Sequence, residues 1–370
     1  MFAAYRHFAW VLALSLVSCG ALPEQLQPSS DRLSLTNTRG KGEFPELTVE
    51  LPCLAGTQQS GDKKLTLRLT ADTAFSATLS QPSSAAAKQA YARLYLVADD
   101  EQTRTPSAKA PELVYEARDD ALAEYGITVE NRSSSRKLCS QLTLRALDPY
   151  RAPTQRQTFA DRLPLPSYVD KVVVAFFDAD ATLRIAPSGS VTPKTADDVM
   201  LLPGVISRVR KAQAAGHLIA IVSNQGGVHW GSTLFSVAEG ALATTARLLA
   251  EHGATVHWFD FAEAYDDNRK PQTGMGKRLE QALRSEHNVQ LDWKKSYMIG
   301  DAGYKKGEDT DVDGQPGIDF SNSDRGFAEN LKIDFVHARD AFGWLKAGSK
   351  RLDSVQAVED FLSAHPHFAD

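Results

Sequence analysis

Two carboxylates, Asp178 and Asp180, stand directly after the continuous apolar run Val172–Phe177. Like charges at this spacing repel each other unless a cation, or a proton-transfer task, holds them in place. Thr182 follows two residues later. Taken alone, the motif is equally compatible with a solvated Asp-rich turn, so its meaning depends on what accompanies it.

Three further polar clusters follow along the chain. Ser223 and Asn224 provide a hydroxyl and an amide suited to binding phosphoryl oxygens. Arg269 and Lys270 precede a predicted helix, and Lys270 supplies a cation able to neutralise an oxyanion. Asp301 adds another carboxylate. Each cluster alone could be an ordinary turn or a solvated surface, whereas all of them in this order indicate phosphoryl chemistry.

Alternating β and α patterns after about residue 168 predict how these clusters are brought together. The predicted strands are 172–177, 218–222, 255–259 and 297–299, and the predicted helices are 205–215, 234–252 and 276–287. Repeated β-then-α units predict an α/β domain with a doubly wound parallel sheet. Its active site is expected at the carboxyl ends of the strands, which is where the polar clusters stand.

The spacing also predicts a capless, open site. Only about forty residues separate Thr182 from Ser223, and a flap, a helix and a strand use them. Between Asn224 and Arg269 a second helix and strand again consume the chain. Neither insertion point has room for a folded cap, so the site can admit the end of a polymer instead of enclosing a small metabolite.

The four motifs in this order resemble the haloacid dehalogenase superfamily of phosphotransferases, over about residues 170–365. The resemblance implies that Asp178 attacks phosphorus and forms an aspartyl-phosphate. It implies that Asp180 protonates the leaving oxygen and later activates water. Ser223 and Lys270 would bind the transferring phosphoryl group.

The same resemblance implies a Mg²⁺ ion held by Asp178, the backbone carbonyl of Asp180, and Asp301, with waters completing the octahedron. The cation would let Asp178 approach an anionic substrate. One departure stands out, because Ala181 occupies a position where many members have Gly. We expect this substitution to alter the turn without abolishing activity.

A narrower resemblance rests on three separated motifs. Asn268–Met275, Ile299–Ala302 and Asp319–Leu331 are similar to the polynucleotide kinase 3′-phosphatase branch. The resemblance implies that Asp324 serves the metal site, orienting metal waters or Lys270. No Gly-x-x-x-x-Gly-Lys-Ser/Thr phosphate loop occurs in the sequence, so no kinase half is expected.

These resemblances imply a Mg²⁺-dependent phosphomonoesterase acting on 3′-phosphate ends of polynucleotides. The chain has 41 Lys and Arg against 46 Asp and Glu, so a polyanion must be bound by a local basic patch. Two alternatives stay open: an exported phosphatase of small phosphate esters such as sugar or nucleotide phosphates, and a catalytically weak surface binding protein. No protein partner follows from the sequence.

The first residues predict the location. Residues 1–18 are typical of a secretory signal, with basic residues before an apolar run too short to span a membrane dependably. The segment ending in Cys19 resembles the bacterial lipobox, which implies that Cys19 is lipidated; an ordinary cleaved signal is the alternative. No Asp follows Cys19, which implies an outer-membrane lipoprotein of the cell envelope, periplasmic or surface-exposed. Residues 19–42, rich in Pro, Ser, Gln and Thr, predict a flexible tether.

Residues 43–150 predict a separate N-terminal antiparallel β-sandwich of unknown role. The strands expected there are 47–51, 65–69, 92–97 and 142–146. Cys53 and Cys139 lie near its two ends, and in an oxidising compartment they predict a disulfide, with two buried thiols as the alternative. Prolines mark residues 151–167 as a linker, which leaves 168–370 for the phosphatase domain.

The insertion before Asp319 resembles the start of a calcium loop, with carboxylates at alternate positions followed by Gly314. We expect a structural Ca²⁺ here, and its ligands would be Asp309, Asp311, Asp313, the carbonyl of Gln315, and Asp319. Phe320 stands where such loops carry a bidentate Glu. A solvated acidic insertion is therefore an equal alternative.

Overall fold

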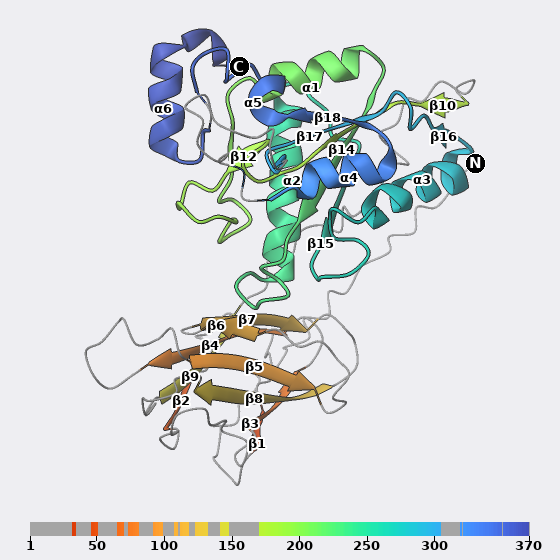
Figure 1. Ribbon diagram of the computed structural model, residues 1–370. Helices are drawn as coiled ribbons and strands as arrows, with labels where there is room; N and C mark the ends of the chain where they lie inside the picture. The colour runs from red at the N-terminus through yellow and green to blue at the C-terminus, as the bar shows by residue number, and fades with distance from the viewer. Residues whose placement is uncertain are drawn as a thin grey trace, which may run out of the picture.

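The computed structural model describes residues 170–304, 319, 321–349 and 351–369, together with nine strands between residues 32 and 147 (Figure 1). The expected signal, lipidated Cys19, the Cys53–Cys139 pair, the linker and the acidic residues 309–315 lie outside the described residues. Among the described residues, no helix is both long and apolar enough to cross a membrane.

The N-terminal part consists of two β-sheets. Its strands are β1 (Arg32–Ser34), β2 (Glu46–Glu50), β3 (Leu65–Leu69), β4 (Thr73–Ser80), β5 (Ala92–Ala98), β6 (Ser107–Lys109), β7 (Glu112–Ala117), β8 (Ala123–Asn131) and β9 (Gln141–Leu147). One sheet has the order β1-β3-β8-β5-β6 and the other β2-β9-β4-β7. Apart from the parallel pair β1–β3, neighbouring strands are antiparallel, which confirms the predicted architecture.

Two details of this part differ from the sequence-based expectation. Strand β1 falls inside residues 19–42, which were predicted as a tether. It was not predicted because a run of three residues is too short to show a strand pattern, and the strand is recognised by its pairing with β3. Strands β4, β6, β7 and β8 were not predicted. In β4 the buried positions include Ala74 and Ala77, whose small side chains make the apolar alternation weak.

The C-terminal part is a parallel sheet with helices on both faces. Its elements are β10 (Lys171–Val172), β11 (Val174–Phe177), β12 (Arg184–Ile185), β13 (Met200–Leu201), α1 (Val205–Ala214), β14 (Leu218–Asn224), α2 (Phe235–Glu251), β15 (Trp258–Ala262), α3 (Gly274–His287), β16 (Gln290–Leu291), β17 (Tyr297–Gly300), α4 (Ser323–Leu331), β18 (Asp334–His337), α5 (Ala338–Ala341), α6 (Val355–Ala364) and a 3₁₀ turn (Pro366–Phe368). The main sheet has the order β15-β14-β11-β17-β18, and every pair in it is parallel.

Alternate side chains of the central strand β11 enter two different cores. Ala175 and Phe177 pack in the core that includes residues of α1, α2 and α6. Val174 and Phe176 pack in the core that includes residues of α3 and α4. The strand is therefore buried on both sides, as its uninterrupted apolar sequence predicts. The doubly wound fold is confirmed (Figure 1).

The boundaries of two strands differ from expectation. The apolar run 172–177 divides into β10, which pairs with β16, and β11, which pairs with β14 and β17. Strand β15 begins at Trp258, three residues later than predicted. Ala254 and Val256 before it are buried, so the apolar pattern there reports core packing and not sheet pairing.

The two parts of the molecule touch at the edge strand β7. The Val114 N–H donates to the carbonyl of Gly231 at 2.6 Å. The Glu116 carboxylate accepts from the Ser236 N–H at 2.9 Å, in the first turn of α2, where a negative charge is favoured by the helix dipole. Leu234 and Val237 pack with Ala74 in a small apolar cluster. The loop between β14 and α2 is thus held from the N-terminal side.

Candidate active site

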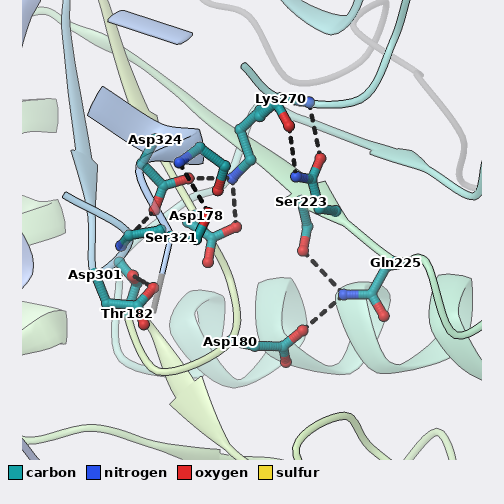
Figure 2. Close-up of polar contacts among 12 residues, drawn as sticks. Asp178, Asp180, Thr182, Ser223, Gln225, Lys270, Asp301, Ser321 and Asp324 are labelled. Atoms are coloured by element: carbon teal, nitrogen blue, oxygen red, sulfur yellow. Dashed lines mark hydrogen bonds and ion pairs between the residues drawn. The ribbon is translucent and has the colours of Figure 1, made fainter. Parts of the chain in front are cut away.

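The parallel register places the predicted site residues at one edge of the sheet. Phe177 pairs with Ile221 of β14 and with Ile299 of β17, so Asp178 follows its strand level with the ends of both neighbours. Ser223 and Asp301 stand at those ends. Figure 2 shows the side chains of these residues gathered in one region, together with Lys270 and Asp324 from later segments.

Lys270 lies between two carboxylates in the interior. Its Nζ is 2.5 Å from Oδ1 of Asp178 and 2.7 Å from Oδ1 of Asp324, and the residue is 2% exposed. Burial acts to lower the pKa of Lys270, but the attraction of the two carboxylates outweighs it and the pKa is raised. The ammonium therefore stays charged and is held against the predicted nucleophile.

Three carboxylates converge at this point. Oxygen atoms of Asp178, Asp301 and Asp324 all lie within 4.8 Å of one another. Burial raises the pKa of Asp178 to about 7, against the opposing effect of Lys270, and the neighbouring Asp324 and Asp180 raise it further. Burial, with Asp178 and Asp324 nearby, also raises the pKa of Asp301 well above its usual value.

This donor set fits a magnesium ion. Three acidic side chains against one buried ammonium would carry an excess of negative charge when all are ionised, and carboxylate oxygens are the ligands that Mg²⁺ prefers. Asp178 and Asp301 were expected as ligands. Asp324 was expected beside the metal or Lys270, and it contacts Lys270 while also accepting from the Ala302 N–H at 3.0 Å. The part assigned to the Asp180 carbonyl stays a prediction.

Asp324 approaches the backbone of the neighbouring strand closely. A Cβ built on Gly300 would overlap Oδ2 of Asp324. Any side chain at residue 300 would therefore displace this carboxylate from the cluster. Thr182, also predicted to belong to the site, is fully buried and its hydroxyl lies 3.4 Å from Oδ1 of Asp301.

Asp180 is held by two residues that sequence reasoning missed. Its Oδ1 accepts from Nε of Arg184 at 3.0 Å, and its Oδ2 accepts from Nε2 of Gln225 at 2.7 Å (Figure 2 shows the second bond). The same Gln225 nitrogen donates to the Ser223 hydroxyl at 2.9 Å. Gln225 thereby links the predicted acid–base residue to a predicted phosphoryl ligand.

Arg184 is an unusual core residue. It is fully buried, and its Nη1 donates to the Thr245 hydroxyl on α2 at 2.9 Å. A buried guanidinium is stable only when it is paired, and here Asp180 supplies the opposite charge. The sequence offers one signal for this role, which is a charged residue directly after the apolar Leu183 and before Ile185.

Asn224 and Arg269 were predicted to bind substrate, and that stays a prediction; the structure shows which groups of the protein Asn224 contacts. Its side-chain amide donates to the Lys270 carbonyl and accepts from the Lys270 N–H, both at 2.9 Å. Asn224 therefore positions the backbone of Lys270. The guanidinium carbon of Arg269 lies 4.2 Å from the ring centroid of Tyr265, and the residue is partly exposed.

Ala181 has a φ of 55°, in the left-handed region that favours glycine. The expectation that a residue other than Gly alters this turn therefore has a structural basis, because a side chain in that region costs free energy. The Ala181 N–H still donates to the Arg184 carbonyl at 2.8 Å. The strained turn connects Asp180 to its ion partner.

Asp319 has partners other than a metal. Its Oδ2 accepts from the Gly303 N–H at 3.2 Å and lies 3.0 Å from Nε2 of His337. The four other expected calcium ligands lie outside the described residues. The calcium site stays a prediction, and its last expected ligand, Asp319, contacts Gly303 and His337.

Both insertion points expected to lack a cap do lack one within residues 170–304. Between Asp180 and Ser223 the chain forms the short hairpin β12–β13 and helix α1, and between Asn224 and Lys270 it forms helix α2 and strand β15. The site is capless, as predicted.

Comparison with known proteins agrees with this site. The family described as polynucleotide kinase 3 phosphatase matches residues 173–342. An uncharacterized 20.8 kDa protein from the FGF-VUBI intergenic region of Autographa californica nuclear polyhedrosis virus is 32% identical over 162 residues, covering 44% of this chain and 81% of the viral protein.

Two further similarities are more distant. A protein of Acanthamoeba polyphaga mimivirus, provisionally described as a bifunctional polynucleotide phosphatase/kinase, is 28% identical over 185 residues, and the match covers 46% of this chain and 42% of that protein. The crystal structure of D,D-heptose 1,7-bisphosphate phosphatase from B. bronchiseptica with magnesium and phosphate is similar with a TM-score of 0.33 and 18% identity, covering 47% of this chain and 99% of that one.

Proposed function

The chain belongs to the polynucleotide kinase 3 phosphatase family of haloacid dehalogenase-like phosphatases, and from that membership we propose that it removes the phosphate from 3′ ends of polynucleotides. The observation that carries the proposal is the buried cluster in which Lys270 joins Asp178 and Asp324. The chain matches less than half of the mimivirus relative, so the substrate is proposed here and not transferred.

In the proposed reaction, Asp178 is the nucleophile. Its carboxylate oxygen attacks phosphorus, the bond from phosphorus to the 3′ oxygen breaks, and an aspartyl-phosphate forms. Lys270 lies against Asp178 and would donate hydrogen bonds to the transferring phosphoryl oxygens. A Mg²⁺ ion held by Asp178, Asp301 and Asp324 would offset the repulsion between the anionic nucleophile and the anionic substrate.

Asp180 is the proposed acid and base. It delivers a proton to the departing 3′ oxygen, and it then takes a proton from the water that attacks phosphorus and releases inorganic phosphate. Arg184 and Gln225 orient its carboxylate. Because Gln225 also contacts Ser223, the same amide connects proton transfer to phosphoryl binding.

The open edge of the sheet supports a polymeric substrate. No folded cap stands over the strand ends within residues 170–304, so a chain end can enter while the rest stays outside. The sharpest test measures Mg²⁺-dependent phosphate release from matched oligonucleotides carrying a 3′ or a 5′ phosphate, and from p-nitrophenyl phosphate and a sugar phosphate. Faster release from the 3′-phosphorylated oligonucleotide is expected, with Asp178→Asn as the inactive control.

Two results would contradict the proposal. Equal kcat/KM for 3′ and 5′ phosphates would remove the end specificity. A higher kcat/KM for the sugar phosphate than for either oligonucleotide would favour the alternative of a small-ester phosphatase.

We propose further that the enzyme acts in the bacterial cell envelope as an outer-membrane lipoprotein attached through Cys19, which rests on the sequence of residues 1–19. Metabolic labelling with a fatty acid should mark the wild-type chain and not Cys19→Ala. Labelling of both chains, or of neither, would contradict a lipid anchor at this residue.

A further inference from the structure

An exposed cluster of aromatic rings lies beside the catalytic segments. Trp230 is 41% exposed and Tyr265 is 49% exposed, although large apolar side chains are usually buried. Trp230 belongs to the loop after β14 and Tyr265 to the loop after β15, and both strands end at the catalytic edge of the sheet. With His229, these residues form what we call the aromatic platform.

The three rings of the platform contact one another edge to face. The centroid distances are 5.1 Å for His229–Trp230, 5.6 Å for His229–Tyr265 and 5.6 Å for Trp230–Tyr265, with interplanar angles between 67° and 75°. The indole N–H of Trp230 donates to the Tyr265 hydroxyl at 3.1 Å. The rings are therefore fixed relative to each other, so a ligand that stacks on them loses little of their conformational freedom.

The platform is connected to the catalytic residues through Arg269. The guanidinium carbon of Arg269 lies 4.2 Å from the Tyr265 ring centroid, a cation–π contact, and the next residue is Lys270. A Cβ on Gly226 would lie 2.9 Å from Nη1 of Arg269, so this glycine lets the guanidinium lie close to the backbone that follows Gln225. Within the described part of the chain, Nη1 of Arg269 is buried and has no hydrogen-bond partner, while the residue as a whole is partly exposed.

The backbone of the platform is held at several points. The His229 N–H donates to the Glu263 carbonyl at 3.1 Å, which ties the two loops together. The Trp230 N–H donates to the Gly226 carbonyl at 3.1 Å, and the next residue, Gly231, accepts from Val114 of the N-terminal sheet. The N-terminal part thus supports the loop that carries Trp230.

From this arrangement we propose that the platform stacks a nucleobase near the 3′ end of a single-stranded polynucleotide, while Arg269 binds a backbone phosphate of the same strand. Aromatic rings attract every base through its π face, and a neighbouring cation attracts the phosphates. The inference rests on the proposed function and deepens it. It also explains how a chain with net charge −5 binds a polyanion, since the binding is local.

The test measures binding in the inactive Asp178→Asn background, with Mg²⁺ present. Fluorescence anisotropy follows a labelled single-stranded oligodeoxynucleotide with a 3′ phosphate, and the same strand lacking the bases of its last two nucleotides. Loss of a stacked base is expected to raise the dissociation constant about 10- to 100-fold when Trp230→Leu and Tyr265→Leu are combined. On the abasic strand the double substitution should add no comparable loss.

Two matched variants separate stacking from a general disturbance. Tyr265→Phe keeps the aromatic ring. In the Asp178→Asn background its dissociation constant should stay within about threefold of that of the protein with Tyr265, because stacking needs the ring and not the hydroxyl. Tyr304→Leu changes another exposed aromatic residue, outside the platform, and should leave binding unchanged. An equal loss with Tyr304→Leu would overturn the assignment to the platform.

The remaining outcomes also decide the question. An unchanged dissociation constant for the double variant, in a protein whose wild type releases phosphate from the same oligonucleotide, overturns the platform and leaves the proposed function intact. An equal loss on the normal and abasic strands assigns the rings to sugar or backbone contacts and overturns base stacking. If Asp178→Asn binds neither strand and the wild type releases no phosphate from them, the proposed function fails and the platform fails with it.

Discussion

Two ion clusters hold the segment between β15 and α3, one through Lys270 and the other through Asn268, and they differ in the balance of their charges. At Lys270, one ammonium contacts Asp178 and Asp324 while Asp301 lies close to both carboxylates. At Arg278, by contrast, the guanidinium meets a single carboxylate, Asp260, at 2.6 and 2.7 Å. A neutral acceptor, the side-chain oxygen of Asn268, completes that second cluster.

The difference separates a ligand site from a structural clamp. The Asp260–Arg278 pair is neutral, and the other Asp260 oxygen accepts from the Phe261 N–H at 2.8 Å, so its hydrogen bonds are satisfied within the chain. The Lys270 cluster sets three acidic side chains against one ammonium, and the raised pKa values of Asp178 and Asp301 show that full ionisation is unfavourable there without a cation. Neighbouring acidic side chains with raised pKa values therefore distinguish the proposed catalytic cluster from the structural pair.

The largest expected effect distinguishes the two clusters by activity. Asp178→Asn should lower kcat by about 10⁵-fold or more, the scale seen when a covalent nucleophile is removed, because an amide is a poor nucleophile. Asp260→Asn should lower kcat less than about tenfold, since it only loosens the segment that carries Lys270. Steady-state phosphate release from both purified variants provides the measurement. Near-normal turnover by Asp178→Asn would refute the mechanism.

Asp180 is the proposed acid and base although its ion partner, Arg184, balances its charge. Asp180→Asn should lower kcat by about 10²–10⁴-fold, the usual share of general acid–base catalysis. A substrate with a good leaving group, such as p-nitrophenyl phosphate, needs less protonation and should show a smaller loss in the aspartyl-phosphate-forming step. Single-turnover kinetics on both substrates tests this, and an equal loss in that step would contradict the role as acid.

His257 extends the contrast to a partly buried group whose pKa is shifted by burial. Burial lowers its pKa to about 4, and its Nδ1 accepts from the Ile219 N–H at 3.0 Å, which only a neutral ring can do. The unfolded chain takes up the proton first, so stability is complete above pH 6.5 and falls as the pH drops toward 4. Between pH 7.5 and 4.5 this should remove roughly 2 kcal/mol from the free energy of unfolding.

Urea unfolding at both pH values measures that loss. His257→Gln should show a smaller drop than the wild type, because the variant has no proton to gain at this position. Identical drops in the two proteins would show that His257 is not the group responsible.

Magnesium should stabilise the protein through the unbalanced cluster alone. Ligand linkage gives about 2.7 kcal/mol when the free ion is at 100 times its dissociation constant. Thermal melting with Mg²⁺ and with a chelator should show this gain in the wild type and in Asp260→Asn. Asp301→Asn, with one fewer carboxylate in the cluster, should show much less, and an equal gain in all three proteins would place the ion elsewhere.

The smallest expected effect concerns the turn between the nucleophile and Arg184. Ala181→Gly should raise the free energy of unfolding by up to about 1 kcal/mol, because glycine adopts the positive φ of this residue without a side-chain clash. Chemical denaturation detects the change. A loss of stability would mean that the greater freedom of glycine in the unfolded chain outweighs the relieved strain.

Much of the phosphatase fold could be read from local patterns. Val172–Phe177 and Leu218–Val222 are apolar on both faces, which is the signature of buried parallel strands. Since parallel strands end at a common edge, the order of the motifs already brought Asp178, Ser223 and Asp301 together. The strand start at Trp258 was missed because Val256 is apolar for packing, and periodicity does not separate packing from pairing.

The sequence by itself determined which residues of the site carry charge and in what order they follow the strands. Tertiary structure alone decided which charges meet. Lys270 comes 92 residues after Asp178, its ion partner. The charged Arg184 donates a hydrogen bond to Thr245, which is 61 residues away in the sequence. No periodicity encodes such contacts, because they depend on how helices and loops pack over the sheet.

The same reason separates the aromatic platform from an ordinary scatter of aromatic residues. Trp230 and Tyr265 stand 35 residues apart in two loops, and neither position has a pattern that marks it as exposed. Adjacent parallel strands β14 and β15 bring the two loops side by side, and only there do the rings touch. Residue types set what chemistry was available to this chain, while strand order and loop packing set where it could be used.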